Sequence, residues 1–255
     1  YGDSYYYRGN VTNNYVEFAG FYWRIVRING DGTVRVIYDG TSAHANGESS
    51  SDRQIGTSAY NDNAYVGYMY GQTGASTYAD AHANTNDSTI KAYIDNWYKT
   101  NIVGTANEQY LADNVFCNDR SISTGTPSGY SNLGYGTERT AYRWYYDPWS
   151  SDSYNSNMRL TCPQQNDAFT VSDTSKGNGA LTYPIGLLST DEIVLAGGWS
   201  ASNSGYYLYS GQWWWASSPN NFNGSNANVR NVNSNGNANN ANNVNNNNGV
   251  RPDSY

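Results

Sequence analysis

Asparagine side chains dominate one stretch of this chain, and their spacing could build a recognition surface. Between residues 220 and 248, 17 of 29 residues are asparagine. Runs such as Asn231-Val232-Asn233 alternate as the two faces of a β-strand do. A plain polyasparagine tract, the alternative interpretation, would be disordered or prone to aggregation and would not need this alternation. The pattern predicts a folded Asn-rich face over 220–248, with amides outward and a buried scaffold of small or apolar residues: Phe222, Ala227, Val229, Val232, Ala238, Ala241, Val244 and Val250.

The amide group suits uncharged polar recognition. It carries two donors and an acceptor, so a face of asparagines can bind sugars, peptide backbone or other asparagines. Three tryptophans precede the face, and in a strand either Trp214 is core while Trp213 and Trp215 face outward, or the reverse. An outward tryptophan could stack on a sugar or a protein. The candidate binding residues are Trp213, Trp215, Asn221, Asn223, Asn226, Asn228, Asn231, Asn233, Asn235, Asn237, Asn240, Asn243, Asn245 and Asn247.

Catalytic and metal chemistry find little support in the sequence. His44 and His82 are the only histidines, and both lie in stretches rich in Ser, Ala and Asn without a nucleophile motif nearby. We expect both to be solvated or structural, and we predict no catalytic residue. No short spacing of His, Cys and carboxylates indicates a metal site, and residues 29–32 fit a hairpin turn better than a calcium loop. No cofactor is predicted.

Composition narrows the class of protein. Disordered chains avoid aromatic residues, so 15% aromatics in 255 residues indicate a folded chain. A net charge of −7 with three lysines argues against a nucleic-acid partner. No apolar run approaches 18 residues, so we expect no membrane contact within this chain. The first residue is not methionine, which is compatible with the loss of an amino-terminal signal or anchor. The two cysteines, Cys117 and Cys162, are either a disulfide in an oxidising location or two buried thiols.

A chain of 255 residues is long enough for one large domain or two small ones. Its strand and helix patterns indicate an α+β fold, which we expect to form a single domain over 1–255. Residues 14–38 alternate as a three-stranded antiparallel meander, in which the arginines at positions 24, 27 and 35 suggest one solvated face. A helical part follows at 87–118, with a helix over Ser88–Ile102 and a second, short one at 107–116.

The remaining elements are short. We predict strands at 158–163, 206–209 and 212–216, and a helix that starts after Ser189 and stops before Gly197. Long irregular loops are expected at 40–86 and 121–157, and the carboxy-terminal part is expected to span 181–255.

Several motifs are distributed along the chain: Trp23-Arg24-Ile25-Val26-Arg27-Ile28-Asn29-Gly30-Asp31-Gly32-Thr33-Val34-Arg35, Ile90-Lys91-Ala92-Tyr93, Trp97-Tyr98, Phe116-Cys117-Asn118-Asp119-Arg120, Tyr183-Pro184-Ile185-Gly186-Leu187, Glu192-Ile193-Val194-Leu195-Ala196-Gly197-Gly198, Trp215-Ala216-Ser217-Ser218-Pro219 and Gly249-Val250-Arg251-Pro252. Together they resemble an uncharacterised extracellular domain family of Gram-positive bacteria, and the resemblance covers 14–252. Some members of that family follow a type IV prepilin-like segment, which this sequence lacks.

The carboxy-terminal half also resembles the C-type-lectin-like fold shared by formylglycine-generating-type proteins and the variable proteins of diversity-generating retroelements. In those variable proteins, asparagine codons of a template mutate to many residues on one binding face, and 220–248 resembles an unmutated template. The lectin calcium motifs and the oxidase site of the formylglycine-generating proteins are missing.

The resemblance implies an extracellular or cell-surface protein that binds a protein or glycan on a cell or phage surface. A structural subunit of a pilus or other filament, packed against identical subunits, is the alternative.

Overall fold

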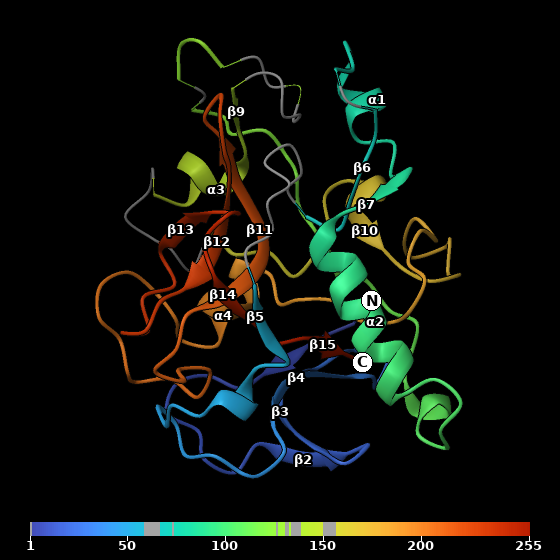
Figure 1. The fold of residues 1–255 in the computed structure, drawn as a ribbon, viewed down its shortest axis with the longest axis vertical. Coiled ribbons are helices and arrows are strands. Elements are labelled where there is room, and N and C mark those ends of the chain that lie inside the picture. Colours follow the sequence, from blue (N-terminus) through green and yellow to red (C-terminus); the bar gives the residue numbers. More distant parts are fainter. Residues whose placement is uncertain are drawn as a thin grey trace.

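The structure, a computed structural model, describes residues 2–58, 67–72, 74–125, 127–130, 133, 139–149 and 157–255. It is a mixed α+β protein in which two sheets and one longer helix carry most of the regular structure (Figure 1). The predicted α+β class is therefore confirmed. Parts of the two predicted loops, residues 59–66, 73, 126, 131–132, 134–138 and 150–156, lie outside the described residues.

The first sheet contains the predicted meander. Three antiparallel strands pair in sequence order, with Ile25 opposite Val36. A short strand near each end of the described chain completes the sheet, since β1 pairs with β3 and β15 pairs with β4. The carboxy-terminal end of the chain is thereby closed onto the amino-terminal meander. The strands are β1 (Tyr5–Tyr6), β2 (Tyr15–Phe18), β3 (Phe21–Ile28), β4 (Val34–Gly40) and β15 (Asp253–Ser254).

The second sheet carries the Asn-rich face. Its strands lie in the order β13-β12-β11-β14-β5, and β9 pairs with the far end of β11. Only the β11–β14 pair is parallel among these pairings. The bounds are β5 (Gly56–Ser58), β9 (Thr140–Ala141), β11 (Trp214–Phe222), β12 (Ala227–Val232), β13 (Asn240–Asn243) and β14 (Asn248–Val250). Two small two-stranded sheets pair β6 (Met69–Tyr70) with β7 (Asn86–Asp87) and β8 (Phe116–Cys117) with β10 (Ala168–Phe169).

Two predicted helices are confirmed. The Ser88 side chain caps α2 (Thr89–Asn101) by accepting the N–H of Lys91. Ser189 and Glu192 form a reciprocal capping box at the start of α4 (Thr190–Leu195). The short helices α1 (Tyr78–Ala81) and α3 (Arg143–Tyr146) complete the set in the described ranges. None of the described helices has the length and apolar character needed to cross a bilayer.

The predicted helix at 107–116 is wrong. One turn of 3-10 helix forms at Glu108–Tyr110, and the chain then extends. The Asp113 carboxylate explains the extension, because it accepts the backbone N–H groups of Val171, Ser172 and Asp173 and so holds a neighbouring loop. The N–H of Ala112 is likewise used by the carbonyl of Tyr255.

Two predicted strands are also wrong. Residues 158–163 form a non-strand segment held by the N–H of Arg159 on Asp191 and by the disulfide of Cys162. Residues 206–209 form a buried turn, in which Tyr209 N–H donates to the Tyr206 carbonyl. The third prediction, 212–216, locates the beginning of β11, which continues to Phe222.

The meander has no solvated arginine face, contrary to the prediction. Arg24, Arg27 and Arg35 are between 1% and 7% exposed, because buried carboxylates lie beside them. Arg24 pairs with Asp39, Arg27 and Arg35 share Glu192, and Arg35 also pairs with Asp253. Eight arginines are buried in the described structure: Arg24, Arg27, Arg35, Arg53, Arg120, Arg143, Arg230 and Arg251.

Candidate binding face

The Asn-rich segment is folded, and its aliphatic residues are its scaffold. It supplies the end of β11, all of β12 and β13, and the start of β14. The predicted scaffold residues are at most 9% exposed, except Ala241, which is half-buried in β13. They divide between the two large apolar clusters of the protein, because Val229 and Val244 pack in one and Val232 and Ala238 in the other. The segment is therefore fixed from both sides of its sheet.

Most of the predicted amides remain open to solvent. Ten of the twelve candidate asparagines are half-buried or exposed: Asn223, Asn226, Asn228, Asn233, Asn235, Asn237, Asn240, Asn243, Asn245 and Asn247. The expectation that Asn221 and Asn231 face outward is wrong, since they are 7% and 1% exposed. Both lie on interior strands, where Asn221 is covered from the β9 side and the Asn231 carbonyl accepts the amide of Asn240 over 2.7 Å.

The tryptophans follow neither predicted alternative. Trp214 and Trp215 are both buried, at 0% and 2% exposure, and Trp213 is 40% exposed. Trp215 is therefore not an outward residue as predicted. The reason is that β11 is an interior strand with an apolar cluster on each side, so alternation moves a side chain from one core to the other. Trp213 lies just before the strand, where its carbonyl accepts the N–H of Gly249.

Several asparagines shape the loops of the face. The Asn223 carbonyl oxygen accepts the N–H groups of Ser225 and Asn226 at 3.0 and 2.9 Å. Asn233 does the same for the N–H groups of Asn235 and Asn237. Such Asx-type bonds stabilise tight turns. These asparagine side chains therefore stabilise the loops between the strands. The exposed asparagines after β13, at 245–247, take less part in such turns.

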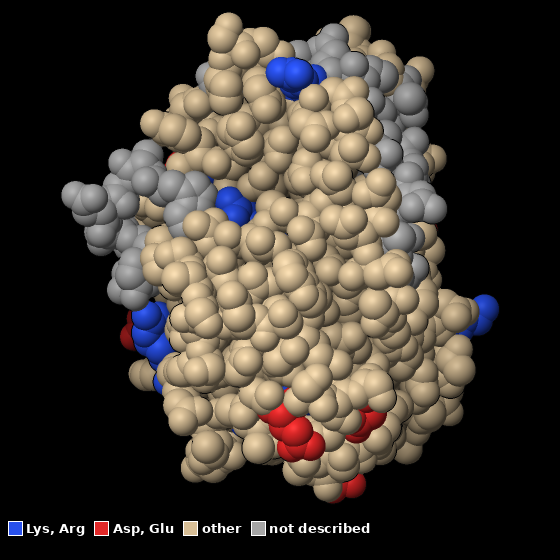
Figure 2. Space-filling model, turned by 60° about the vertical axis from the view of Figure 1, so that its left-hand side comes forward, with Lys and Arg blue, Asp and Glu red and all other residues tan. Residues whose placement is uncertain are grey.

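The face presents amides with few charges nearby. Figure 2 brings the β13 side forward, and the middle of this view is almost wholly free of Lys, Arg, Asp and Glu. The arginine inside the segment, Arg230, is 4% exposed and donates to Asn239 over 2.8 Å and to the carbonyl of Trp144. Burial lowers the pKa of Arg230 to about 9. Recognition at this surface would depend on hydrogen bonds and stacking.

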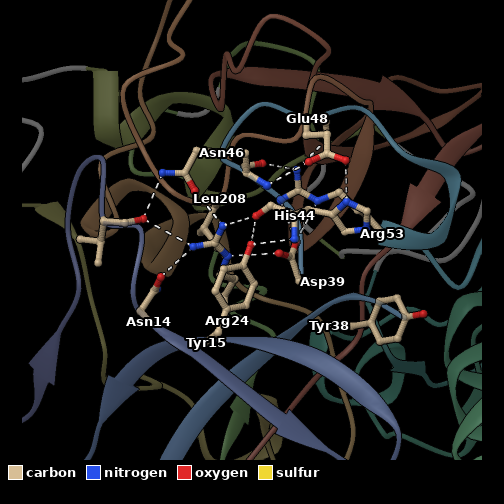
Figure 3. A network of polar contacts seen from close by, with 12 residues as sticks. Asn14, Tyr15, Arg24, Tyr38, Asp39, His44, Asn46, Glu48, Arg53 and Leu208 are labelled. Atoms are coloured by element: carbon tan, nitrogen blue, oxygen red, sulfur yellow. Dashed lines mark hydrogen bonds and ion pairs between the residues drawn. The ribbon is translucent and has the colours of Figure 1, made fainter. Parts of the chain in front are cut away.

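A buried ionic cluster anchors the end of the face (Figure 3). Asp39 is fully buried and accepts hydrogen bonds from Arg24 at 3.1 Å, Arg53 at 2.7 Å and Arg251 at 2.7 Å. The other donors of these arginines reach backbone carbonyls, such as Arg251 to Leu208, and the side-chain oxygens of Asn14 and Asn46, which accept from Arg24. Burial lowers the pKa of Arg251 to about 10, against the raising effect of Asp39. Arg251 follows β14 directly, so this cluster joins the end of the Asn-rich segment to the meander.

His44 lies beside this cluster between two carboxylates. Its Nδ1 is 2.9 Å from Glu48 and its Nε2 is 3.0 Å from Asp52, and the hydroxyl of Ser42 is 3.4 Å from Nε2. Burial lowers the pKa of His44, but the hydrogen bonds of Asp52 and Glu48 outweigh it and the pKa is raised. Both ring nitrogens therefore already have a carboxylate partner, and the Ser42 hydroxyl is a more distant neighbour of Nε2.

His82 is structural in a different way. It is 1% exposed, stacks on Tyr78 with ring centroids 3.8 Å apart, and lies with Nδ1 2.8 Å from the Tyr78 carbonyl oxygen. Burial, followed by the Arg120 charge, lowers its pKa to about 3. Both histidines are thus buried, so the expectation that they could be solvated is wrong.

The two cysteines are joined. Of the two alternatives left open by the sequence, the disulfide between Cys117 and Cys162 is the one that forms. Within the described ranges, no three His, Cys, Asp or Glu side chains gather as a metal site would require.

Sequence reasoning missed the buried arginines, which position the whole face. A signal was present, because Arg24 and Arg27 alternate with aromatic and β-branched residues in a strand too apolar for one solvated side. It also missed that Asn220 and Asn248, at 8% and 2% exposure, belong to the interior.

One comparison with known proteins gives a result. The family model described as a domain of unknown function (DUF6273) matches residues 42–253. The matched range contains the whole Asn-rich face and both Arg251 and Asp253. No curated protein and no solved structure matches the chain.

Proposed function

This chain belongs to the family described as a domain of unknown function (DUF6273), and we propose that it is an extracellular binding or adhesion module. Its ligand is a protein or glycan on a cell or phage surface, recognised by the Asn-rich face and by Trp213. The observation that carries the proposal is the division of this segment into buried aliphatic residues and solvent-accessible amides. A rigid scaffold lowers the entropy cost of ordering such a surface when a ligand binds.

We further infer a C-type-lectin-like fold with a retroelement-type variable region. Support comes from the pairing of β15 with β4, which joins the two ends of the domain, and from the loops around the second sheet. The exposed amides of Asn245 and Asn247 occupy positions where a change of side chain would leave the scaffold intact. The face would then accept many side chains on one fold.

A binding comparison tests the proposal. The double variant Asn245→Ala/Asn247→Ala removes two exposed amides of the face, and Asn13→Ala/Asn96→Ala removes two exposed amides elsewhere. The probe is an array of bacterial surface glycans and phage and bacterial surface proteins. We expect wild-type binding to be retained in the Asn13/Asn96 variant and weakened about tenfold or more in the Asn245/Asn247 variant and in Trp213→Ala. Equal binding by all variants, or no binding by the wild type, would contradict the proposal.

A filament subunit is the second candidate, and the edge strand β13 favours it. β13 ends the second sheet, and its four residues, Asn-Ala-Asn-Asn, carry no charge or proline. Natural edge strands usually carry such residues to prevent pairing with other chains. If β13 pairs with a second copy, sedimentation velocity should show self-association of the wild type that Asn242→Lys abolishes. A monomeric wild type would rule out this assembly.

A further inference from the structure

A second surface feature lies away from the Asn-rich face. A cleft of about 440 Å³ is lined by the first described residues, the β3–β4 turn, the segment around the disulfide, the start of α4 and Tyr255. In Figure 1 the carboxy-terminal end, which carries Tyr255, lies on the side of the molecule away from β13. The volume lies within the range of small-molecule sites, about 300–1,000 Å³.

The walls of the cleft are fixed by specific contacts. The Cys117–Cys162 disulfide lines one wall. Across the cleft rim, Lys176 pairs with Asp31 at 3.2 Å. At the buried end, Arg27 donates to the carboxylate of Glu192 and to the hydroxyl of Tyr255. These bonds predict a preformed cleft that needs little rearrangement to accept a ligand.

Two of the acidic side chains of the cleft, Glu192 and Asp31, already have positively charged or hydrogen-bonding partners in the protein. Glu192 accepts hydrogen bonds from Arg27 and the Ser189 N–H and forms an ion pair with Arg35. Burial raises the pKa of Glu192, but the charges of Arg35 and Arg27 outweigh this effect and the pKa is lowered. Hydrogen bonds from Thr33, with a smaller contribution from Lys176, lower the pKa of Asp31 to about 2. Asp3 is exposed to solvent. The two partnered carboxylates are therefore ionised and already have cationic or hydrogen-bond partners.

One basic group of the cleft, the guanidinium of Arg159, is only weakly paired. The side chain of Arg159 is 45% exposed, and its ion pair with Asp119 is long, at 3.8 Å. Asp119 is shared with Arg143, which lies 3.7 Å away. A guanidinium has five donors in a planar fork that matches a carboxylate. Arg27 adds donors at the buried end, since its three bonds to Asn29, Glu192 and Tyr255 use three of five N–H groups.

We propose that this cleft binds a small ligand with one carboxylate group, which Arg159 contacts directly. The lining contains three basic residues, Arg27, Arg159 and Lys176, and three acidic ones, Asp3, Asp31 and Glu192. A singly charged carboxylate suits this balanced lining better than a doubly charged phosphate, because the weakly paired guanidinium of Arg159 offers one positive charge. A peptide carboxyl terminus and a uronic acid share this chemistry. The proposal does not depend on the function of the Asn-rich face.

Calorimetric titration tests the cleft with two pairs of probes. N-acetyl-glycyl-glycine and glucuronic acid carry the carboxylate, and their amides are the neutral controls. We expect one carboxylate to bind and its amide to bind at least about tenfold more weakly. Whether the peptide or the sugar acid binds identifies the source of the ligand.

Substitutions test whether Arg159 makes the proposed contact with the ligand carboxylate. Arg159→Gln should weaken binding about tenfold or more, while Lys99→Gln, an equal charge change at an exposed site on α2, should leave it unchanged. Thr161→Trp, at an exposed residue of the lining, should block the cleft without removing a charge. The Asn245→Ala/Asn247→Ala variant should bind as the wild type does, which separates this result from the test of the Asn-rich face. Failure of both carboxylates to bind the wild type, or full binding by Arg159→Gln and Thr161→Trp, would overturn the proposal.

Discussion

Arg251 and Asp39 are 212 residues apart in the chain, and Nη2 of Arg251 lies 2.7 Å from Oδ1 of Asp39. Both side chains are fully buried, so this contact is shielded from water. Since Arg251 follows the last strand of the Asn-rich segment, the contact fixes that segment to the meander. A single carboxylate accepts from three guanidinium groups here, and backbone carbonyls and two asparagine side chains accept other donors of these arginines.

Replacement of this carboxylate should destabilise the fold. Asp39→Asn leaves the shape nearly unchanged but removes the negative charge that three buried arginines share. Loss of one partner of a buried ion pair costs about 3–5 kcal/mol, because the remaining charge stays buried. We expect the free energy of unfolding in urea to fall by about this amount. Glu17→Gln, an equal change on an exposed residue of β2, should stay within about 0.5 kcal/mol. Equal stabilities would show that the uncharged acceptors around the three arginines hold the cluster without the Asp39 charge.

His44 should make the stability depend on pH. Its pKa is raised in the folded protein, although burial opposes the shift, by the hydrogen bonds of Asp52 and Glu48. A raised folded pKa contributes stability that is fully present below the unfolded value of about 6.5 and is lost as pH rises through the folded value. The pKa values of both carboxylates are lowered, so their own contributions are lost only in more acidic solution.

The measurement is the difference in unfolding free energy between the wild type and His44→Gln. We expect this difference to be largest near pH 5.5 and to decrease steadily towards pH 9. A difference that grows with pH would mean that the neutral imidazole is the form the fold prefers. His82→Gln is not a suitable control, because the pKa of His82 is lowered and its pH dependence has the opposite sign.

Local patterns predicted the elements whose signals are local. The meander, α2 and α4 each depend on alternation or on a capping side chain within a few residues, and these were identified. The scaffold of the Asn-rich face was identified for the same reason, since Val229 and Val232 alternate with amides.

Long-range contacts account for most of the errors. Asn231 and Asn245 are the same residue in similar surroundings, and only the neighbouring strands make one buried and the other exposed. Trp215 is buried because β11 has a core on both sides, which no local period reveals. The arginines of the meander are buried because their carboxylates come from distant positions such as Glu192 and Asp253.

The disulfide should contribute strongly to stability. Cys117 and Cys162 are separated by 45 residues, so the bond restricts a long loop in the unfolded chain. Disulfides of this kind contribute about 2–4 kcal/mol, by a mechanism that includes unfolded-state entropy. Cys117→Ser/Cys162→Ser should lose about this much in urea unfolding. Dithiothreitol should destabilise the wild type to a similar extent and leave the double variant unchanged. Labelling of free thiols in urea, followed by mass spectrometry, shows whether dithiothreitol has reduced the disulfide. A wild type whose disulfide is reduced but whose stability is unchanged would contradict the prediction.

Substitution tolerance within the Asn-rich face should follow burial. Asn231 is 1% exposed and accepts the amide of Asn240, whereas Asn245 is exposed. Asn231→Arg should lower the unfolding free energy by at least about 2 kcal/mol, because it overpacks an interior strand and buries a charge. Asn245→Arg should change it by less than about 0.5 kcal/mol.

Natural variation offers the same test without mutagenesis. If this segment is a variable region, sequences of the same locus from related isolates should differ at exposed positions such as Asn245 and Asn247. The buried asparagines at 220, 221, 231 and 248 should stay constant, because any replacement there disturbs the interior. Variation spread evenly over buried and exposed asparagines would contradict the arrangement of the face. An absence of variation at the exposed asparagines would contradict the variable-region proposal. It would leave the predicted stabilities of Asn231→Arg and Asn245→Arg unaffected.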